Sequence, residues 1–120
     1  KPLGVSRLAP GEAAQVFKAQ VRPELDGERL PTLMCGMIGS NIGWRDAGYA
    51  PCPASAADLV ARLVTPADGP APVRIAPGLL AQRSSGAPDV MRGEETQIFG
   101  WLAMRPDRLR GRHLICHPGT

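Results

Sequence analysis

The chain has 120 residues, of which 43% are hydrophobic and 21% charged, a balance typical of a globular protein with one domain and a modest core. Its net charge of +3 is spread along the sequence and aromatic residues make up only 4%, so we expect no nucleic-acid-binding surface. No apolar run approaches the ~18 residues of a membrane span. Three cysteines without a Cys-x-x-Cys pair favour a reducing, cytoplasmic location over a disulfide framework.

The first half of the chain predicts one helix and one strand. A helix follows Pro10-Gly11 and is limited by Pro23, because apolar residues at helical spacing lie between them. Residues 32–36 form an apolar run that is too short for a helix, which predicts a buried strand leading into a glycine-rich stretch. Residues 41–55 predict a loop, because glycines and prolines recur through them.

The second half of the chain predicts two further helices. Ser55 caps the first of them, with Asp58 in a capping-box position, and Pro66 ends it. The second runs from Glu94 to about Met104, because its apolar residues recur at i, i+3 and i+4.

Two strands accompany these helices. Residues 73–76 predict a strand that runs into Pro-Gly, residues 81–93 predict a polar loop, and residues 113–120 predict a final apolar strand. Short strands that alternate with helices and end in glycine-rich loops are typical of an α/β fold, in which the loops carry the site.

The stretch "CGMIGSNIGW" places Gly36, Gly39 and Gly43 directly after a predicted strand. Their backbone amides could approach an anion. Their spacing matches neither a P-loop nor a dinucleotide-binding fingerprint, and a tight turn explains the glycines as well.

Polar and aromatic side chains follow these glycines. Trp44 and Tyr49 could form one wall of a polar ligand pocket, or both rings could pack the loop onto the core. In the first case Ser40, Asn41 and Arg45 supply hydrogen bonds. Arg45 could hold a substrate carboxylate through two parallel N–H bonds, although an exposed surface arginine is the commoner case.

Two features stand near the C-terminus. His113, Cys116 and His117 are close in sequence, but on a strand the histidines share one face and the cysteine lies on the other, so we expect a buried Cys116 and no metal site. The four arginines within residues 105–112 predict a solvated loop or a rim that faces an anion.

Two adjacent carboxylates, Glu94 and Glu95, open the third predicted helix and follow Arg92-Gly93. The helix macrodipole favours negative charge at this end, which explains one glutamate better than two. A kinase that acts on an alcohol needs a carboxylate to take the hydroxyl proton, and a helix start beside a glycine suits that role. Both explanations stay open from the residues alone.

Several segments, in this order, resemble the 2-dehydro-3-deoxygalactonokinase family, the sugar-acid kinases of galactonate breakdown: "LMCGMIGSNIGW", "YAPCPA", "IAPGL", "PDVMRGEETQIFG" and the terminal "PGT". The resemblance extends from about Gly4 to Thr120. It implies an α/β fold with short strands alternating with helices, part of an actin-like ATPase (ribonuclease H-like) lobe. It also implies transfer of the γ-phosphoryl group of ATP, with Mg²⁺, to the 6-hydroxyl of 2-dehydro-3-deoxy-D-galactonate.

The resemblance also assigns roles to residues. It implies that Glu94 or Glu95 is the catalytic base, at the start of a helix that links two lobes. It implies contacts with the sugar acid from Ser40, Asn41, Trp44, Arg45, Tyr49 and Arg92. Gly119 and Thr120 would form a cofactor-binding turn for the phosphates of ATP. Residues 1–112 would then be the later part of the first, sugar-binding lobe, and residues 113–120 the first strand and phosphate turn of the second.

Parts of the family pattern are missing from the sequence. The Asp-Trp-Gly-Thr phosphate turn that opens the family is absent, as is the adenosine-binding half of the second lobe. We therefore expect an internal fragment of a longer kinase that is inactive alone and whose exposed strand edges favour self-association. The alternative is a non-catalytic module that binds a sugar acid or a partner.

Overall fold

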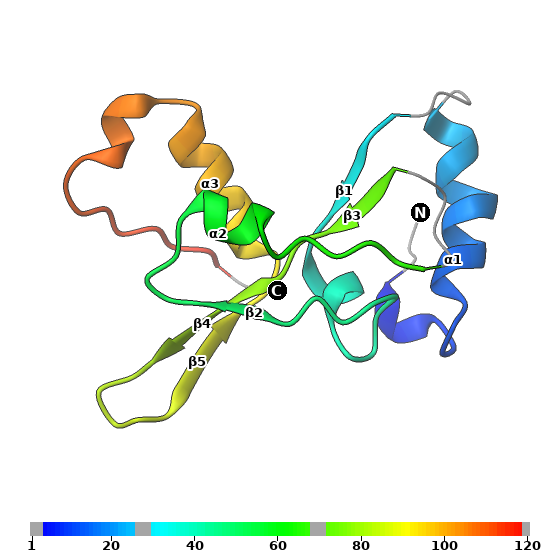
Figure 1. The fold of residues 1–120 in the computed structure, drawn as a ribbon, viewed down its shortest axis with the longest axis horizontal. Helices are drawn as coiled ribbons and strands as arrows, with labels where there is room; N and C mark the ends of the chain where they lie inside the picture. Colours follow the sequence, from blue (N-terminus) through cyan, green and yellow to red (C-terminus); the bar gives the residue numbers. More distant parts are fainter. Residues whose placement is uncertain (1–3, 26–29, 68–71, 119–120) are drawn as a thin grey trace.

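The structure, a computed structural model, describes residues 4–25, 30–67 and 72–118 and has a mixed α/β fold (Figure 1). Its α-helices are α1 (Ala13–Val16), α2 (Ala56–Val60) and α3 (Glu94–Ala103). Its strands are β1 (Thr32–Met34), β2 (Tyr49–Pro51), β3 (Val73–Ile75), β4 (Gly78–Gln82) and β5 (Pro88–Met91). Short 3-10 helices lie at Val5–Arg7, Arg22–Leu25, Gly36–Gly39 and Pro106–Leu109, and a π-helical turn lies at Phe17–Val21.

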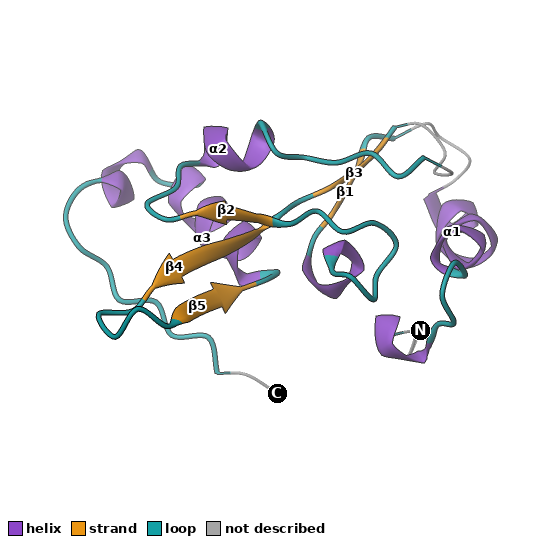
Figure 2. Cartoon of the chain, turned by 60° about the horizontal axis from the view of Figure 1, so that its bottom comes forward, coloured by secondary structure: helices purple, strands orange, loops and turns teal. Residues whose placement is uncertain are grey.

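The strands form two small sheets. Strand β1 pairs with β3 in parallel, and the second sheet has the order β2-β4-β5, with β2 parallel and β5 antiparallel to β4. Figure 2 shows α2 and α3 beside the three-stranded sheet and α1 at the far end of the molecule, beyond β1 and β3. The parallel pairs agree with the predicted α/β pattern, whereas the antiparallel hairpin does not belong to it.

One extended segment, residues 73–82, joins the two sheets. Its first part pairs with β1 and its second part with β2, and only Ala76 and Pro77 lie between them. The segment that connects their partner strands β1 and β2, residues 35–48, makes a long excursion over the same interval. Because proline has no N–H to donate, the buried Pro77 suits the point at which no partner strand is present.

The hydrophobic core is small and centres on this segment. Its fully buried side chains include Val73, Ile75 and Pro77, and the smaller Ala50 is equally enclosed. At the other end of the molecule Phe17 is buried against Trp44, with ring centroids 5.6 Å apart, which attaches the N-terminal helix to the excursion.

The predicted helices are present with different lengths. The first is one continuous helical run through α1, the π-helical turn and the 3-10 helix, so Pro23 lies inside its last turn. Helix α2 begins with the predicted capping box of Ser55 and Asp58, but it ends at Val60, before Pro66. Helix α3 confirms the third predicted helix.

Three sequence-based predictions about strands were wrong. Residues 41–55 contain β2, and the predicted polar loop at residues 81–93 contains β5 and the end of β4. Strand β2 depends on β4, a partner distant in sequence. Strand β5 pairs with its neighbour β4 in a hairpin, but it is exposed at every residue, so it has no alternating pattern. Residues 112–118 form no strand within the described part of the chain, because no other strand pairs with them there.

The three cysteines are free thiols and all are exposed, so the prediction of a buried Cys116 was wrong. With residues 112–118 outside any sheet, no neighbouring strand covers this thiol. None of the helices in the described ranges has the length and apolar character needed to span a bilayer.

Candidate active site at the start of helix α3

The candidate site lies where the excursion between β1 and β2 meets the N-terminus of α3. We call residues 36–48 of this excursion the glycine loop. Two of its glycines are required by close packing, since a Cβ on Gly39 would lie 2.9 Å from the Ile75 side chain and a Cβ on Gly43 would lie 2.2 Å from the Ile38 carbonyl oxygen. The glycines therefore let the loop fold tightly on the strand below it, as the tight-turn interpretation predicts.

Gly93 brings the start of α3 against the same loop. Its φ of +112° is accessible to glycine but strained for other residues, and a Cβ there would lie 3.2 Å from the Gly36 Cα atom. The backbones of the loop and of the helix start are thus in direct contact.

Arg92 makes the longest-range contacts of the site. Its Nη1 donates to the Gly39 carbonyl at 2.5 Å and its Nη2 donates to the Gly48 carbonyl at 3.0 Å. Its guanidinium carbon lies 4.2 Å from the centroid of the Tyr49 ring. The half-buried guanidinium therefore joins two points of the glycine loop, one near its start and one at its end, to the residue that precedes α3 by two positions.

Glu94 and Glu95 have different environments although they are neighbours. Glu95 is 0% exposed, and its carboxylate accepts hydrogen bonds from the Gly93 N–H at 2.6 Å and the Thr96 hydroxyl at 3.4 Å. Glu94 is half-buried, and its Oε2 accepts the Arg92 N–H at 3.1 Å. Both carboxylates thus bind backbone amides at the positive end of the α3 dipole, and Glu94 is the one with a surface open to a ligand.

The other predicted substrate residues of the loop do not all converge on this point. The Ser40 side chain is 6% exposed and donates to the Met37 carbonyl at 2.7 Å. Trp44 is half-buried against Phe17, on the side of α1, and Arg45 is exposed. Asn41 lines a hollow of about 410 Å³ between the loop and residues 5–11.

Tyr49 lies at the junction, with its ring over Gly78. A Cβ on Gly78 would lie 2.8 Å from the Tyr49 ring and 2.5 Å from the Met91 carbonyl oxygen, so only glycine allows the ring to lie there. Of the residues predicted as a site, the structure thus brings together Tyr49, Arg92, Glu94 and Glu95. Ser40 is held inside the loop, and Asn41, Trp44 and Arg45 lie outside this group.

The C-terminal histidines lie in a different place. His113 packs edge-on against Trp101, with ring centroids 5.3 Å apart, and His117 lines a hollow of about 470 Å³ with Cys116 and part of α3. Among the described residues no three His, Cys, Asp or Glu side chains converge as metal ligands would. The predicted phosphate turn, Gly119 and Thr120, lies outside the described residues.

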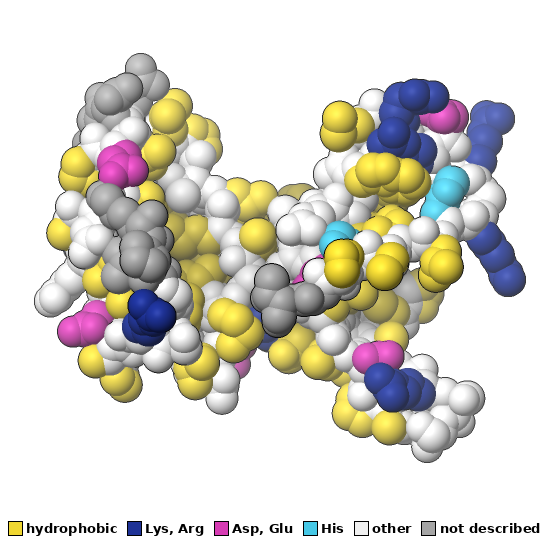
Figure 3. All heavy atoms as spheres, turned by 180° about the vertical axis from the view of Figure 1, so that it is seen from behind, with side chains coloured by type: hydrophobic (Ala, Val, Ile, Leu, Met, Phe, Trp, Pro, Cys, Tyr) yellow, Lys and Arg dark blue, Asp and Glu magenta, His cyan; other side chains and the backbone are white. Residues whose placement is uncertain are grey.

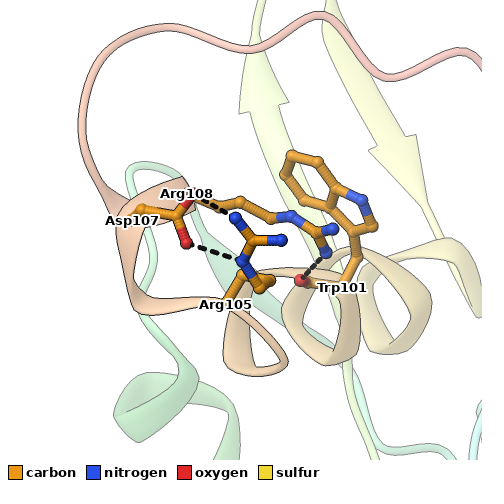
Figure 4. A network of polar contacts seen from close by, with 4 residues as sticks. All are labelled: Trp101, Arg105, Asp107 and Arg108. Atoms are coloured by element: carbon orange, nitrogen blue, oxygen red, sulfur yellow. Dashed lines mark hydrogen bonds and ion pairs between the residues drawn. The ribbon is translucent and has the colours of Figure 1, made fainter.

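Two members of the C-terminal arginine run contact their own segment. Arg105 pairs with Asp107 at 3.0 Å, and Arg108 lies over the Trp101 ring at 4.4 Å while donating to the Trp101 carbonyl (Figure 4). Arg110 and Arg112 are exposed. Figure 3 shows several basic side chains at this end of the molecule.

The arrangement has the parts that acid–base chemistry on a polar ligand needs. A carboxylate with an open surface stands at a helix N-terminus, fixed by a backbone amide, beside a loop rich in backbone polar groups. Sequence reasoning selected the helix start from its charge, and it missed that Arg92 fixes the glycine loop. No local pattern could have shown it, because the contacts join residues 53 and 44 positions apart.

Comparison with known proteins identifies the family. A family model for 2-keto-3-deoxy-galactonokinase, another name for 2-dehydro-3-deoxygalactonokinase, matches residues 1–120. The chain is 47% identical over 91 residues to a probable 2-dehydro-3-deoxygalactonokinase of Rhizobium meliloti (strain 1021), a match that covers 76% of this chain and 28% of the relative. It is 37% identical over 106 residues to the 2-dehydro-3-deoxygalactonokinase of Escherichia coli (strain K12), covering 88% of this chain and 35% of the relative.

A solved structure agrees with these matches. The chain resembles a crystal structure of a Sinorhizobium meliloti protein assigned as a 2-dehydro-3-deoxygalactonokinase, with a TM-score of 0.66 and 36% identity. That match covers 76% of this chain and 30% of the other, so the chain spans about a third of the length of the relatives it matches. Because the family model matches from the first residue to the last, the chain belongs to the 2-keto-3-deoxy-galactonokinase family.

Proposed function

We propose that this chain supplies part of a kinase that transfers the γ-phosphoryl group of ATP to the 6-hydroxyl of 2-dehydro-3-deoxy-D-galactonate, in the cytoplasm, during galactonate catabolism. The observation that carries the proposal is the family match over residues 1–120. The names of the two curated relatives support the same substrate. Because the chain spans about a third of those relatives, the complete activity is assigned to a protein of their length and not to residues 1–120 alone.

We further propose the place of the chain in such a kinase. Residues 1–112 form the later part of a first, sugar-binding lobe of the actin-like ATPase type, and residues 113–120 enter the second lobe. The two parallel strand pairs support a lobe of the α/β kind. Residues 112–118 belong to neither sheet, which supports a change of lobe near this point.

Within the described ranges, no three His, Cys, Asp or Glu side chains converge as metal ligands would. The carboxylate oxygens at the start of α3 that bind amides are directed at the protein backbone. We therefore derive only the role of this chain toward the acceptor sugar.

We assign the base to Glu94. In phosphoryl transfer to an alcohol, the carboxylate accepts the hydroxyl proton as the oxygen attacks phosphorus. The Arg92 N–H fixes Oε2 of Glu94, and the half-buried side chain leaves the carboxylate accessible to a sugar hydroxyl. Glu95 is fully enclosed and serves the backbone at Gly93, so we assign it a structural role.

The exposed face of the glycine loop and Tyr49 would then contact the sugar acid. Arg45 is an exposed cation on that loop, which suits it to meet a carboxylate. Asn41 and Trp44 contribute through the shape of the loop, since the first lines the hollow beside residues 5–11 and the second packs on Phe17.

The test uses a chimera in which residues 1–120 replace the matching segment of the E. coli relative. ATP-dependent phosphorylation of 2-dehydro-3-deoxy-D-galactonate is expected, measured by coupled release of ADP. Glu94→Gln is expected to lower kcat by about 10²–10⁴-fold with little change in KM, because only the transition state uses the base.

Glu95→Gln is the matched control for this test. Its expected effect is a lower melting temperature, because a buried acceptor of the Gly93 N–H loses its charge. If Glu94→Gln keeps its kcat while folded Glu95→Gln loses it, the base is Glu95. A chimera that binds the sugar acid in calorimetry yet never phosphorylates it would favour a non-catalytic binding module instead.

We also propose that the isolated 120-residue chain associates with itself. Its accessible surface is 8541 Å², and large apolar side chains such as Leu33 and Val60 are more than half exposed. Figure 3 shows hydrophobic side chains on the surface and a deep notch between its two halves. Large apolar side chains that are exposed in this way favour coverage by another chain.

A further inference from the structure

Arg92 occupies a bridging position that neither the family match nor the sequence assigns. Its guanidinium donates to two backbone carbonyls, at Gly39 and Gly48, near the start and at the end of the glycine loop. Such bonds from an ionised donor are stronger than neutral ones, and a planar arginine can serve two acceptors at once.

Each of these carbonyls also closes a backbone hydrogen bond of the fold. The Gly39 carbonyl accepts the Ala47 N–H at 3.0 Å, and the Gly48 carbonyl accepts the Gly78 N–H at 3.1 Å. Arg92 therefore binds where the loop closes on itself and where the loop rejoins the sheet.

The backbone of the same residue holds the candidate base. The Arg92 N–H donates to Oε2 of Glu94 at 3.1 Å, so one residue fixes the loop through its side chain and the carboxylate through its backbone. Tyr49 covers one face of the guanidinium at 4.2 Å. A substrate carboxylate would have to compete with these contacts to bind the arginine bidentately.

We propose that Arg92 is a positioning residue, which sets the distance between the substrate-binding glycine loop and Glu94 without itself binding the sugar acid. The inference rests on the proposed kinase function. It replaces the sequence-based expectation that Arg92 contacts the substrate.

The kinetic test compares Arg92→Met and Arg92→Lys in the chimera described above. Lysine keeps the charge but cannot span both carbonyls in the planar geometry of arginine. If Arg92 positions the base, both variants lose about 100-fold in kcat while KM changes little, because a small misplacement of reacting groups costs that much. If Arg92 instead binds the substrate, Arg92→Met raises KM at least as strongly as it lowers kcat, and Arg92→Lys recovers much of the lost kcat/KM. This result would overturn the proposal.

Arg83→Met is the matched control. Arg83 is an exposed arginine that pairs with Asp89 on the β4–β5 hairpin, and it lies outside the site. Its removal is expected to leave kcat and KM unchanged.

A second measurement does not depend on catalysis. In the 120-residue chain, amide hydrogen exchange of Ala47 and Gly78 is expected to accelerate in Arg92→Met and to stay unchanged in Arg83→Met, because both amides share a carbonyl with Arg92. Unchanged protection of both amides would overturn the positioning role. Altered protection in a chimera that has no kinase activity would keep that role and reject the proposed function.

Discussion

Glu94 and Glu95 are adjacent in the chain and chemically identical, but their side chains lie in different environments. At a helix N-terminus the first amides lack helical acceptors, so each glutamate reaches back two residues, to Arg92 and Gly93. The helical rotation between consecutive residues then places Glu95 inside the protein and leaves Glu94 partly open. A doubled acid can thus provide one structural and one reactive carboxylate.

Gly93, the residue before α3, makes this geometry possible, which leads to a prediction that compares it with a glycine inside the helix. Gly93→Ala is expected to destabilise the chain by about 1–3 kcal/mol, because alanine is strained in this backbone region. Its Cβ would also press on Gly36. The melting temperature and the unfolding midpoint in urea measure the loss.

Gly100→Ala is the control in the same helix. Gly100 is exposed in the interior of α3 with no atom within 4 Å of a built Cβ, so alanine is expected to stabilise by roughly 0.5–1 kcal/mol. Equal effects of both substitutions would contradict the conformational argument.

Among the elements, α2 depends most on its cap. It has five residues, too few to be stable by helix propensity alone, and its capping box satisfies both the Ser55 and Asp58 backbone amides. The hydrogen bond from the Ser55 hydroxyl, followed by that from the Ser55 N–H, holds the pKa of Asp58 below its usual range.

This depressed pKa predicts the sign of a pH effect. Because the folded-state pKa of Asp58 is lower than its unfolded value, the carboxylate stabilises the folded chain above the unfolded pKa, near 3.8, and this contribution is lost as the pH falls through the folded pKa. Asp58→Asn is therefore expected to unfold at lower urea than the wild type at neutral pH, with the difference vanishing in acid.

The Ser55→Ala background provides the check. Because Ser55 is the main partner of Asp58, Asp58→Asn is expected to lower the free energy of unfolding at neutral pH by less in this background than in the wild type. A difference that persists unchanged at the lowest pH, or in the Ser55→Ala background, would show that another interaction of Asp58 is responsible.

The elements also show where the sequence is informative. Helices α2 and α3 were predictable because capping residues and apolar spacing are local signals. Strands β2 and β5 were missed because they have only three and four residues and become strands by pairing with β4. Strand β2 contains a proline and every residue of β5 is exposed, so neither shows an apolar strand pattern. The apolar run at residues 113–118 was predicted as a strand for the opposite reason, since hydrophobicity alone does not supply a partner.

The same distinction applies to the candidate site. The acidic helix start and the glycine loop were selected from composition and spacing, and the structure places them in contact. Which glutamate is enclosed, and which way Trp44 and Arg92 point, depends on packing between segments distant in the chain. No single-sequence pattern carries that information.

As a whole molecule, the chain exposes more surface than its mass requires. A compact monomer of 12.7 kDa has about 6,200 Å² of accessible surface and a 120-residue domain a radius of gyration of about 13.6 Å. The observed values are 8541 Å² and 15.7 Å. The excess, about 2,300 Å², falls within the range that obligate protein interfaces bury.

This excess predicts association of the isolated chain, measured by sedimentation over a wide range of concentration. An apolar hollow of about 280 Å³ between α2 and α3, with Leu33 and Val60 at its border, is the expected contact. Val60→Lys is expected to shift the population toward monomer, because it places a charge in that contact.

Val90→Lys is the matched control, since Val90 is similarly exposed, at 54% against 65% for Val60, but lies on the hairpin away from the hollow. Equal effects of the two substitutions would assign association to general hydrophobicity. A chain that stays monomeric at every concentration would contradict the prediction altogether.

The excursion of the glycine loop has a consequence for how specificity can evolve. Its two ends are fixed to nearly the same point of one strand, by the Ala76 N–H to the Met34 carbonyl and by the Gly78 N–H to the Gly48 carbonyl. Insertions and replacements between these anchors need not disturb the strand pairing on either side. Arg92 holds the loop through carbonyl groups, which every amino acid possesses. The exposed side chains of the loop, such as Asn41, Ile42 and Arg45, can therefore change while its anchorage persists. Under the proposed function, a new acceptor sugar would therefore require changes only at these exposed positions, on an unaltered scaffold.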